Sequence, residues 1–86
     1  MYSAELSQNA AKFLSKLDAT ISSRIKEKLK TLAQNPVPSD SKFITRENND
    51  KIFRLRIGDY RALYKIKEAG RIVLISKVDK RPRVYG

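Results

Sequence analysis

The sequence predicts a single α+β domain over residues 1–86, ordered as a strand, two antiparallel helices and a three-stranded antiparallel β-meander. Three observations indicate this class. Residues 2–6 alternate apolar and polar side chains, residues 7–35 carry two apolar stripes at helical spacing, and residues 51–78 hold three β-rich runs joined by short turns. A chain of 86 residues has room for one hydrophobic core. We therefore expect one domain and no second one.

The first strand and the first helix are predicted directly after Met1. The alternation over residues 2–6 is typical of a short, half-buried strand. Ser7 is suited to N-cap the helix that follows, because its hydroxyl can accept from a free backbone N–H. The next apolar side chains recur at i, i+3, i+4 and i+7, namely Ala10, Phe13, Leu14 and Leu17. This spacing predicts an amphipathic helix.

A second helix is predicted after a short link. Asp18 or Thr20 can cap it, and Asn35-Pro36 ends it, because the residue before a proline disfavours helical backbone. Its apolar residues at helical spacing are Ile21, Ile25, Leu29, Leu32 and Ala33. The short link makes the two helices antiparallel, and both apolar stripes are expected to pack on a sheet.

The remaining residues predict the meander. Residues 36–41 are rich in turn-forming residues, and we expect the stretch from there to Asp50 to be a loop around Phe43 and Ile44. Strands are predicted over 51–57, 60–67 and 71–78. The connections at Gly58-Asp59 and at residues 68–70 are both typical of β-hairpins.

Composition excludes several classes of function. The sequence has no cysteine and no histidine, which excludes disulfides, thiolate zinc sites and catalysis by either side chain. No run approaches the roughly 18 apolar residues that a membrane span needs, and residues 1–10 lack the basic and apolar regions of a signal peptide. We expect a cytoplasmic protein without a membrane partner.

The positive charge is concentrated in the second half of the chain. The net charge is +10. Residues 1–50 have eight Lys and Arg against six Asp and Glu, whereas residues 51–86 have eleven against three. Six of those eleven are arginines: Arg54, Arg56, Arg61, Arg71, Arg81 and Arg83. This asymmetry favours a polyanionic partner such as nucleic acid.

The Gly58-Asp59 turn predicts how the first two meander strands pair. A two-residue loop places Ile57 opposite Tyr60 and Arg56 opposite Arg61. One face, with Phe53, Leu55, Ile57, Tyr60, Ala62 and Tyr64, is expected to pack on the helices, and the other to carry Arg54, Arg56 and Arg61. Like charges directly opposite each other destabilise a sheet. A bound phosphate would remove this repulsion, so the cluster is predicted to bind phosphate.

The third meander strand and the tail are predicted to extend this cluster. If Lys67 pairs with Arg71, then Lys77 lies beside Arg61. Pro82 is expected to end the strand, so residues 80–86 form a short tail that leaves the sheet and carries Arg81, Arg83 and Tyr85. The aromatic ring of Tyr85 is suited to anchor the tail or to stack on a base.

The run over residues 53–64, followed by residues 75–83 and Tyr85, resembles the RelE branch of the RelE/ParE toxin superfamily. The shared pattern is R-x-R, a turn, G-x-Y-R-x-x-Y and a C-terminal K-R before a tyrosine. The resemblance covers nearly the whole chain and implies one RelE-like domain. It also implies a type II toxin that cleaves mRNA in the ribosomal A site without a metal or other cofactor, with the substrate's 2′-hydroxyl as nucleophile.

The resemblance also implies roles for individual residues. Arg61 matches the family's main phosphate-stabilising arginine. Arg54 and Arg56 stand where characterised members often have lysines, and would hold the RNA backbone and orient the scissile phosphate. Arg81 matches an arginine proposed to assist the leaving 5′-oxygen, with Arg83 as the alternative. Tyr85 matches a tyrosine proposed to deprotonate the 2′-hydroxyl or to stack on the base, although its spacing from Arg81 is shorter than in the best-studied members.

Two other functions remain open at this point. One is inhibition of DNA gyrase by binding, as in the ParE branch, which needs no catalytic residues. The other is a non-catalytic RNA-binding module in which every arginine positions phosphate. The resemblance further implies a small, acidic, RelB-like antitoxin that forms a hetero-oligomer with the chain, with mRNA and the ribosome as the other partners.

Overall fold

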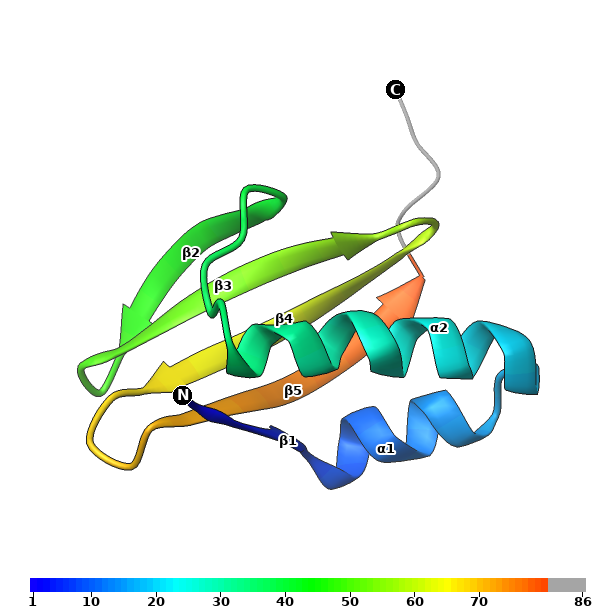
Figure 1. Ribbon diagram of the computed structural model, residues 1–86, viewed down its shortest axis with the longest axis horizontal. Helices are drawn as coiled ribbons and strands as arrows, with labels where there is room; N and C mark the ends of the chain where they lie inside the picture. The colour runs from blue at the N-terminus through cyan, green and yellow to red at the C-terminus, as the bar shows by residue number, and fades with distance from the viewer. Residues whose placement is uncertain (81–86) are drawn as a thin grey trace.

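Residues 1–80 of the protein form a five-stranded sheet with two helices on one of its faces (Figure 1). The computed structural model describes residues 1–80. Its elements are the strands β1 (Ser3–Leu6), β2 (Ser41–Glu47), β3 (Asp50–Ile57), β4 (Tyr60–Lys67) and β5 (Ile72–Lys80), the helices α1 (Gln8–Ser15) and α2 (Ala19–Lys30), and a 3₁₀ turn, Thr31–Ala33. The predicted α+β class is confirmed.

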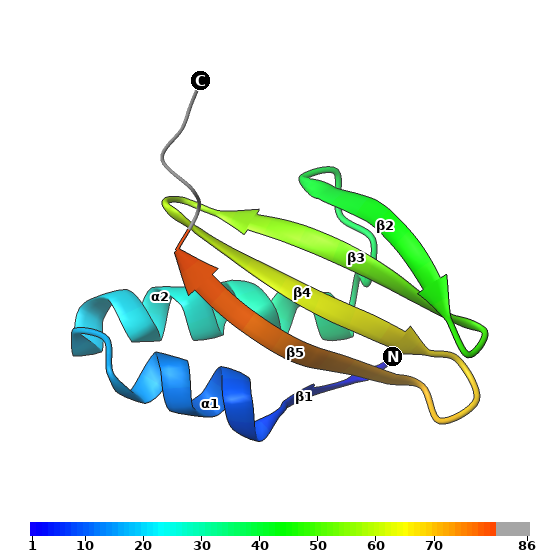
Figure 2. The ribbon, with the colours of Figure 1, turned by 180° about the vertical axis from the view of Figure 1, so that it is seen from behind.

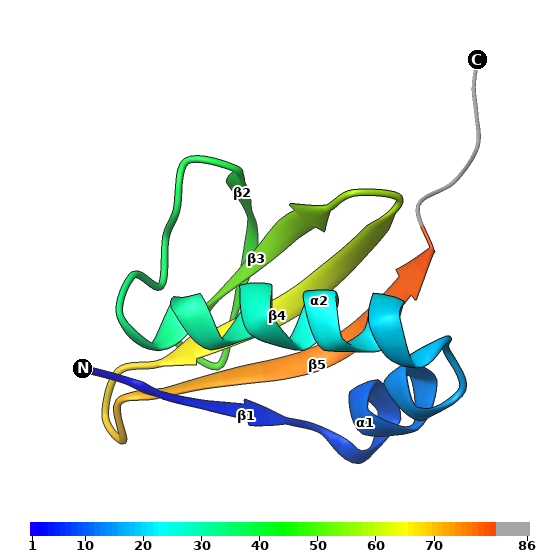
Figure 3. The same ribbon diagram turned by 45° about the vertical axis from the view of Figure 1, so that its right-hand side comes forward.

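The strands are ordered β1-β5-β4-β3-β2. β1 pairs with β5 in parallel, and the other neighbouring strands pair antiparallel. A parallel pair needs a long crossover connection. Here the chain between β1 and β5 includes both helices, which run antiparallel to each other in Figure 1. Figure 3 shows α2 lying across the strands. The other face of the sheet, opposite the helices, is turned toward the viewer in Figure 2 and is not covered by either helix.

The helices begin where the sequence predicts. The Ser7 hydroxyl accepts a hydrogen bond from the backbone N–H of Ala10 at 3.1 Å, and the Asp18 carboxylate accepts one from Thr20 at 3.1 Å. Asp18 is therefore the cap of α2. No helix within residues 1–80 is long and apolar enough to cross a membrane.

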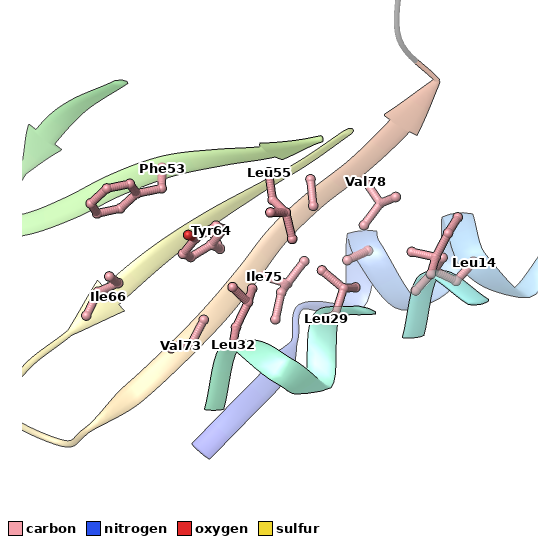
Figure 4. Close-up of a cluster of buried hydrophobic side chains, with 13 residues drawn as sticks. Leu14, Leu29, Leu32, Phe53, Leu55, Tyr64, Ile66, Val73, Ile75 and Val78 are labelled. Atoms are coloured by element: carbon pink, nitrogen blue, oxygen red, sulfur yellow. The ribbon is translucent and has the colours of Figure 1, made fainter. Parts of the chain in front are cut away.

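The hydrophobic core lies between the helices and the sheet (Figure 4). The helical side contributes Ala10, Leu14, Ile25, Leu29 and Leu32, and the sheet contributes Phe53, Leu55, Ala62, Tyr64, Ile66, Val73, Ile75 and Val78. Leu55, Ala62 and Tyr64 are fully buried. Ile21, which belongs to the apolar stripe predicted for the second helix, lies near the start of α2 and is 37% exposed. The predicted core face of β3 and β4 is thus confirmed.

The prediction of a loop up to Asp50 is wrong, because residues 41–47 form the edge strand β2. This strand pairs antiparallel with β3, so the meander has four strands. The connection to β3 is a tight turn in which Asn48 and Asn49 have φ of 50° and 70°. Asparagine tolerates this left-handed conformation, and two such residues form the turn type favoured in two-residue hairpins.

Candidate functional site

The β3–β4 hairpin sets the positions of the predicted arginines. Its turn contains Gly58, whose φ of 58° suits a residue without a Cβ. Ile57 pairs with Tyr60, Arg56 with Arg61, and Phe53 with Tyr64. The predicted register is therefore confirmed. Because strand side chains alternate between faces, Arg54, Arg56 and Arg61 share the sheet face that the helices leave uncovered.

These three arginines line a pocket of about 440 Å³. The other lining residues come from the end of the α2–β2 connection and the start of β2: Ser39, Asp40, Ser41 and Lys42. Lys42 lies directly opposite Arg54 in the β2–β3 pairing. Four cationic side chains thus surround one pocket. Guanidinium groups bind phosphate through two N–H donors at once, so the pocket is suited to a phosphodiester.

Lys42 was missed by the sequence prediction, which placed it in a loop. The signal was present in the run Ser-Lys-Phe-Ile-Thr-Arg-Glu, in which β-favouring residues precede an Asn-Asn dipeptide. A bulge between Phe43 and Thr45 interrupts the alternation that would have marked the strand.

Hydrogen bonds hold the segment that forms the pocket wall. The buried Tyr64 donates its hydroxyl to the carbonyl oxygen of Pro36 at 2.6 Å, and Ser41 donates to the carbonyl of Pro38 at 2.7 Å. Burial raises the pKa of Tyr64, so its phenol stays protonated as a donor. Lys28 of α2 lies 2.9 Å from the Asp40 carboxylate and lowers the pKa of that carboxyl through their hydrogen bond. These contacts connect the pocket wall to both the core and α2.

Arg61 is held by a carboxylate that the sequence prediction did not place there. Its Nε lies 3.1 Å from Oδ1 of Asp79, its direct neighbour on β5. The predicted pairing of Lys67 with Arg71 is wrong, because Lys67 pairs with Ile72 and a bulge between Leu63 and Tyr64 shifts the register again.

Lys77 was predicted to lie beside Arg61 on the neighbouring strand. It does not lie directly opposite Arg61, because the register differs from the predicted one. It pairs with Leu63 instead. It still lies on the uncovered face, and its Nζ is 3.6 Å from Oδ2 of Asp79. Asp79 therefore lies between two cations that belong to neighbouring strands.

Three predicted site residues, Arg81, Arg83 and Tyr85, lie outside the described residues. The last described residue is Lys80, which pairs with Tyr60 next to Arg61.

Among the predicted site residues, the structure brings together Arg54, Arg56 and Arg61 around one pocket. It also adds Lys42 and Asp79 to the site.

Comparisons with known proteins identify the family. The family model described as the ParE toxin of the type II toxin–antitoxin system parDE matches residues 4–85. A protein of Methanocaldococcus jannaschii named as a candidate toxin RelE1 is 31% identical over 85 residues, which cover 98% of this chain and 94% of that protein.

Solved structures agree with this match. RelE in the RelE–RelB complex of the archaeon Pyrococcus horikoshii superposes with a TM-score of 0.85 at 26% identity, over 96% of this chain and 98% of that one. The toxin–antitoxin complex RelBE2 of Mycobacterium tuberculosis gives a TM-score of 0.77 at 30% identity, over 93% and 91%. The chain therefore belongs to the RelE/ParE superfamily of toxins from type II toxin–antitoxin systems.

Proposed function

We propose that this toxin is a ribosome-dependent, metal-independent endoribonuclease that cleaves mRNA in the ribosomal A site. The observation that carries the proposal is the convergence of Arg54, Arg56 and Arg61 with Lys42 around one pocket. In the reaction, the 2′-oxygen of the RNA forms a bond to the adjacent phosphorus while the bond to the 5′-oxygen breaks. The products are a 2′,3′-cyclic phosphate and a 5′-hydroxyl.

The arginines supply the electrostatic part of this reaction. Negative charge on the phosphate oxygens must be stabilised as the two bonds exchange, and fixed guanidinium groups do so without reorganisation. Arg61 stabilises the transferred phosphoryl group, and Arg56 and Arg54 orient it and hold the backbone. Lys77, on the same face, contacts a neighbouring phosphate.

The proton transfers are assigned to the C-terminal residues. As a phenolate, Tyr85 accepts the proton of the 2′-hydroxyl, and Arg81, or Arg83 in its place, donates a proton to the leaving 5′-oxygen. Free tyrosine and free arginine both have pKa values well above neutral pH, so both are weak acid–base catalysts at neutral pH. Such groups fit an enzyme whose site is completed by the ribosome, and negligible cleavage of free RNA follows from this.

A small, acidic, RelB-like antitoxin is the proposed protein partner. Both of the solved structures described above are complexes of a toxin with its antitoxin. A net charge of +10 favours an acidic protein that covers the basic face and forms a hetero-oligomer with the toxin in the cytoplasm, where translation takes place.

The proposal is tested by expressing the chain without an antitoxin and mapping the 5′ ends of translated and untranslated messages. We expect cuts only in translated messages, and a loss of about 10²–10³ in cleavage rate for Arg61→Ala. Arg24→Ala is the matched control, because Arg24 is exposed on α2, away from the pocket. Equal cutting of untranslated messages would refute the dependence on the ribosome.

Gyrase inhibition is the second candidate, because the matching family model is that of ParE. It predicts growth arrest with intact messages and broken DNA. The same expression experiment separates the two functions. If the chain inhibits gyrase without using the arginine pocket, Arg61→Ala should cause as much DNA damage as the wild type.

A further inference from the structure

Asp79 is the only carboxylate within residues 1–80 that forms an ion pair with one of the pocket arginines. Its Oδ1 accepts from Nε of Arg61 at 3.1 Å, and its Oδ2 lies 3.6 Å from Nζ of Lys77. The side chains of Arg61 and Asp79 are 34% and 29% exposed, so the pair is partly shielded from water. An acidic group beside a phosphate-binding arginine weakens anion binding, so Asp79 has an electrostatic cost at this position.

The β4–β5 bulge is what places Asp79 there. Tyr64 pairs with Ile75 and Leu63 pairs with Lys77, so Ser76 is the extra residue. If the pairing instead continued in register beyond Tyr64 and Ile75, with no bulge, Val78 would lie opposite Arg61. The bulge instead turns Val78 into the core, where it is 2% exposed, and Asp79 toward the uncovered face.

The bulge is stabilised by its own hydrogen bonds. Ser76 donates its hydroxyl to the carbonyl oxygen of Leu63 at 3.2 Å, and its carbonyl oxygen accepts from the hydroxyl of Ser7 at 2.9 Å. Ser7 is also the cap of α1. The helix cap, the bulge and the Arg61–Asp79 pair are therefore parts of one connected arrangement.

We infer that Asp79 is a positioning residue that fixes the guanidinium plane of Arg61 for phosphoryl transfer, an inference that rests on the proposed function. A guanidinium donates through Nε and through its two Nη groups. When Nε–H is bonded to Asp79, the plane is fixed and both Nη groups remain for two phosphate oxygens. Asp79 itself touches no substrate. Its charge lowers the affinity for RNA, while the orientation it imposes raises the rate of the chemical step.

The test measures single-turnover cleavage on ribosomes programmed with mRNA, using the full chain. For Asp79→Ala we expect the rate at saturating ribosome concentration to fall about 10- to 100-fold. The half-saturating concentration should stay equal or decrease, because a negative charge has been removed. Asp79→Asn should restore most of the rate, since its amide oxygen can still accept from Nε. Asp59→Asn is the charge control, because Asp59 lies in the β3–β4 turn and forms no ion pair within residues 1–80.

Coupling to Arg61 distinguishes positioning from a general structural role. If Asp79 acts through Arg61, the double variant Arg61→Ala/Asp79→Ala should cleave no more slowly than Arg61→Ala. A rate for Asp79→Ala equal to or above wild type would overturn the inference, as would an additional loss in the double variant. Unchanged cleavage by Arg61→Ala would instead overturn the proposed function and the inference with it.

A second measurement does not depend on activity. The Nε–H proton of Arg61 should exchange slowly with solvent in the wild type and in Asp79→Asn, as followed by ¹⁵N NMR of the full chain. It should exchange several-fold faster in Asp79→Ala. Equal exchange in all three proteins would overturn the inference, even if one variant were inactive because it folds poorly.

Discussion

Arg56 of β3 and Arg61 of β4 are direct cross-strand neighbours that line the same pocket. The backbone N–H of Arg56 donates to the backbone carbonyl oxygen of Asp40, just before β2, at 3.5 Å. Two guanidinium groups are thus presented side by side, with Asp79 partly compensating one of them. This arrangement has a cost in stability and is suited to binding an anion.

Replacing Arg56 by threonine should stabilise the fold and weaken RNA binding. The free energy of unfolding should rise by about 0.2–1 kcal/mol, because like charges no longer face each other and threonine favours strands. Urea denaturation at low and at high salt provides the measurement. The gain should shrink at high salt, where the repulsion is already screened. A lower stability at low salt would contradict this view of the pair.

Lys42 should contribute one phosphate contact to RNA binding. Lys42→Ala should weaken binding of a single-stranded RNA and reduce the slope of log K against log salt concentration by about 0.7. Fluorescence anisotropy over a series of salt concentrations measures both quantities. The matched control is Lys12→Ala, since Lys12 is exposed on α1. An unchanged slope for Lys42→Ala would remove Lys42 from the binding site.

Gly58 should be replaceable by asparagine but not by alanine. Its φ of 58° is unfavourable for residues with a Cβ, so Gly58→Ala should cost about 1–2 kcal/mol in unfolding free energy. Asparagine tolerates the same conformation and should cost less. A Cβ at this position would meet no atom within 4 Å, so the difference reports the backbone alone. Equal denaturation midpoints for the two variants would show that the turn is not strained.

The hydroxyl of Tyr64 should contribute to stability through Pro36. Tyr64→Phe removes the 2.6 Å hydrogen bond and leaves a carbonyl oxygen without its donor, at a cost of about 1–3 kcal/mol in unfolding free energy. Tyr60→Phe is the control, because the half-buried Tyr60 makes no side-chain hydrogen bond within residues 1–80. Thermal denaturation of the two variants gives the comparison, and equal melting temperatures would show that the Tyr64 bond adds nothing.

Asp40 should make the stability of the fold depend on pH on the acid side. The hydrogen bond from Lys28 lowers the pKa of Asp40 below its ordinary value of 3.8, so the folded state favours the ionised form. This contribution is fully present above the unfolded pKa and is lost as the pH falls through the folded one. Between about pH 5 and pH 3, the urea midpoint of wild type should therefore fall more steeply than that of Asp40→Asn. Parallel profiles would exclude the contribution.

The hairpin that carries the arginines could be predicted because its determinants are local. A two-residue Gly-Asp turn and the alternation of apolar and charged residues on both sides fix the pairing of Arg56 with Arg61. The helix caps at Ser7 and Asp18 are also local signals. The C-terminal assignments to Arg81, Arg83 and Tyr85 remain predictions from the family resemblance.

The strand β2 and the position of Asp79 could not be predicted in the same way. Residues 41–47 become a strand because they pair with β3, and the bulge in β2 hides their alternation. The register of β4 with β5 depends on one extra residue, Ser76. Its hydroxyl donates a hydrogen bond to the carbonyl oxygen of Leu63, and its carbonyl oxygen accepts one from the hydroxyl of the distant Ser7.

The sequence by itself determined that the chain folds as a strand, two helices and a meander, and that Arg54, Arg56 and Arg61 share one sheet face. Side-chain alternation and a short turn act over a few residues, so they can be recognised without the rest of the fold. The tertiary structure decided that Lys42 completes the pocket and that Asp79, not Lys77, lies opposite Arg61. Both depend on one-residue bulges in the β2–β3 and β4–β5 pairings. A bulge changes which side chains face each other, and local alternation in the sequence does not reveal where it falls.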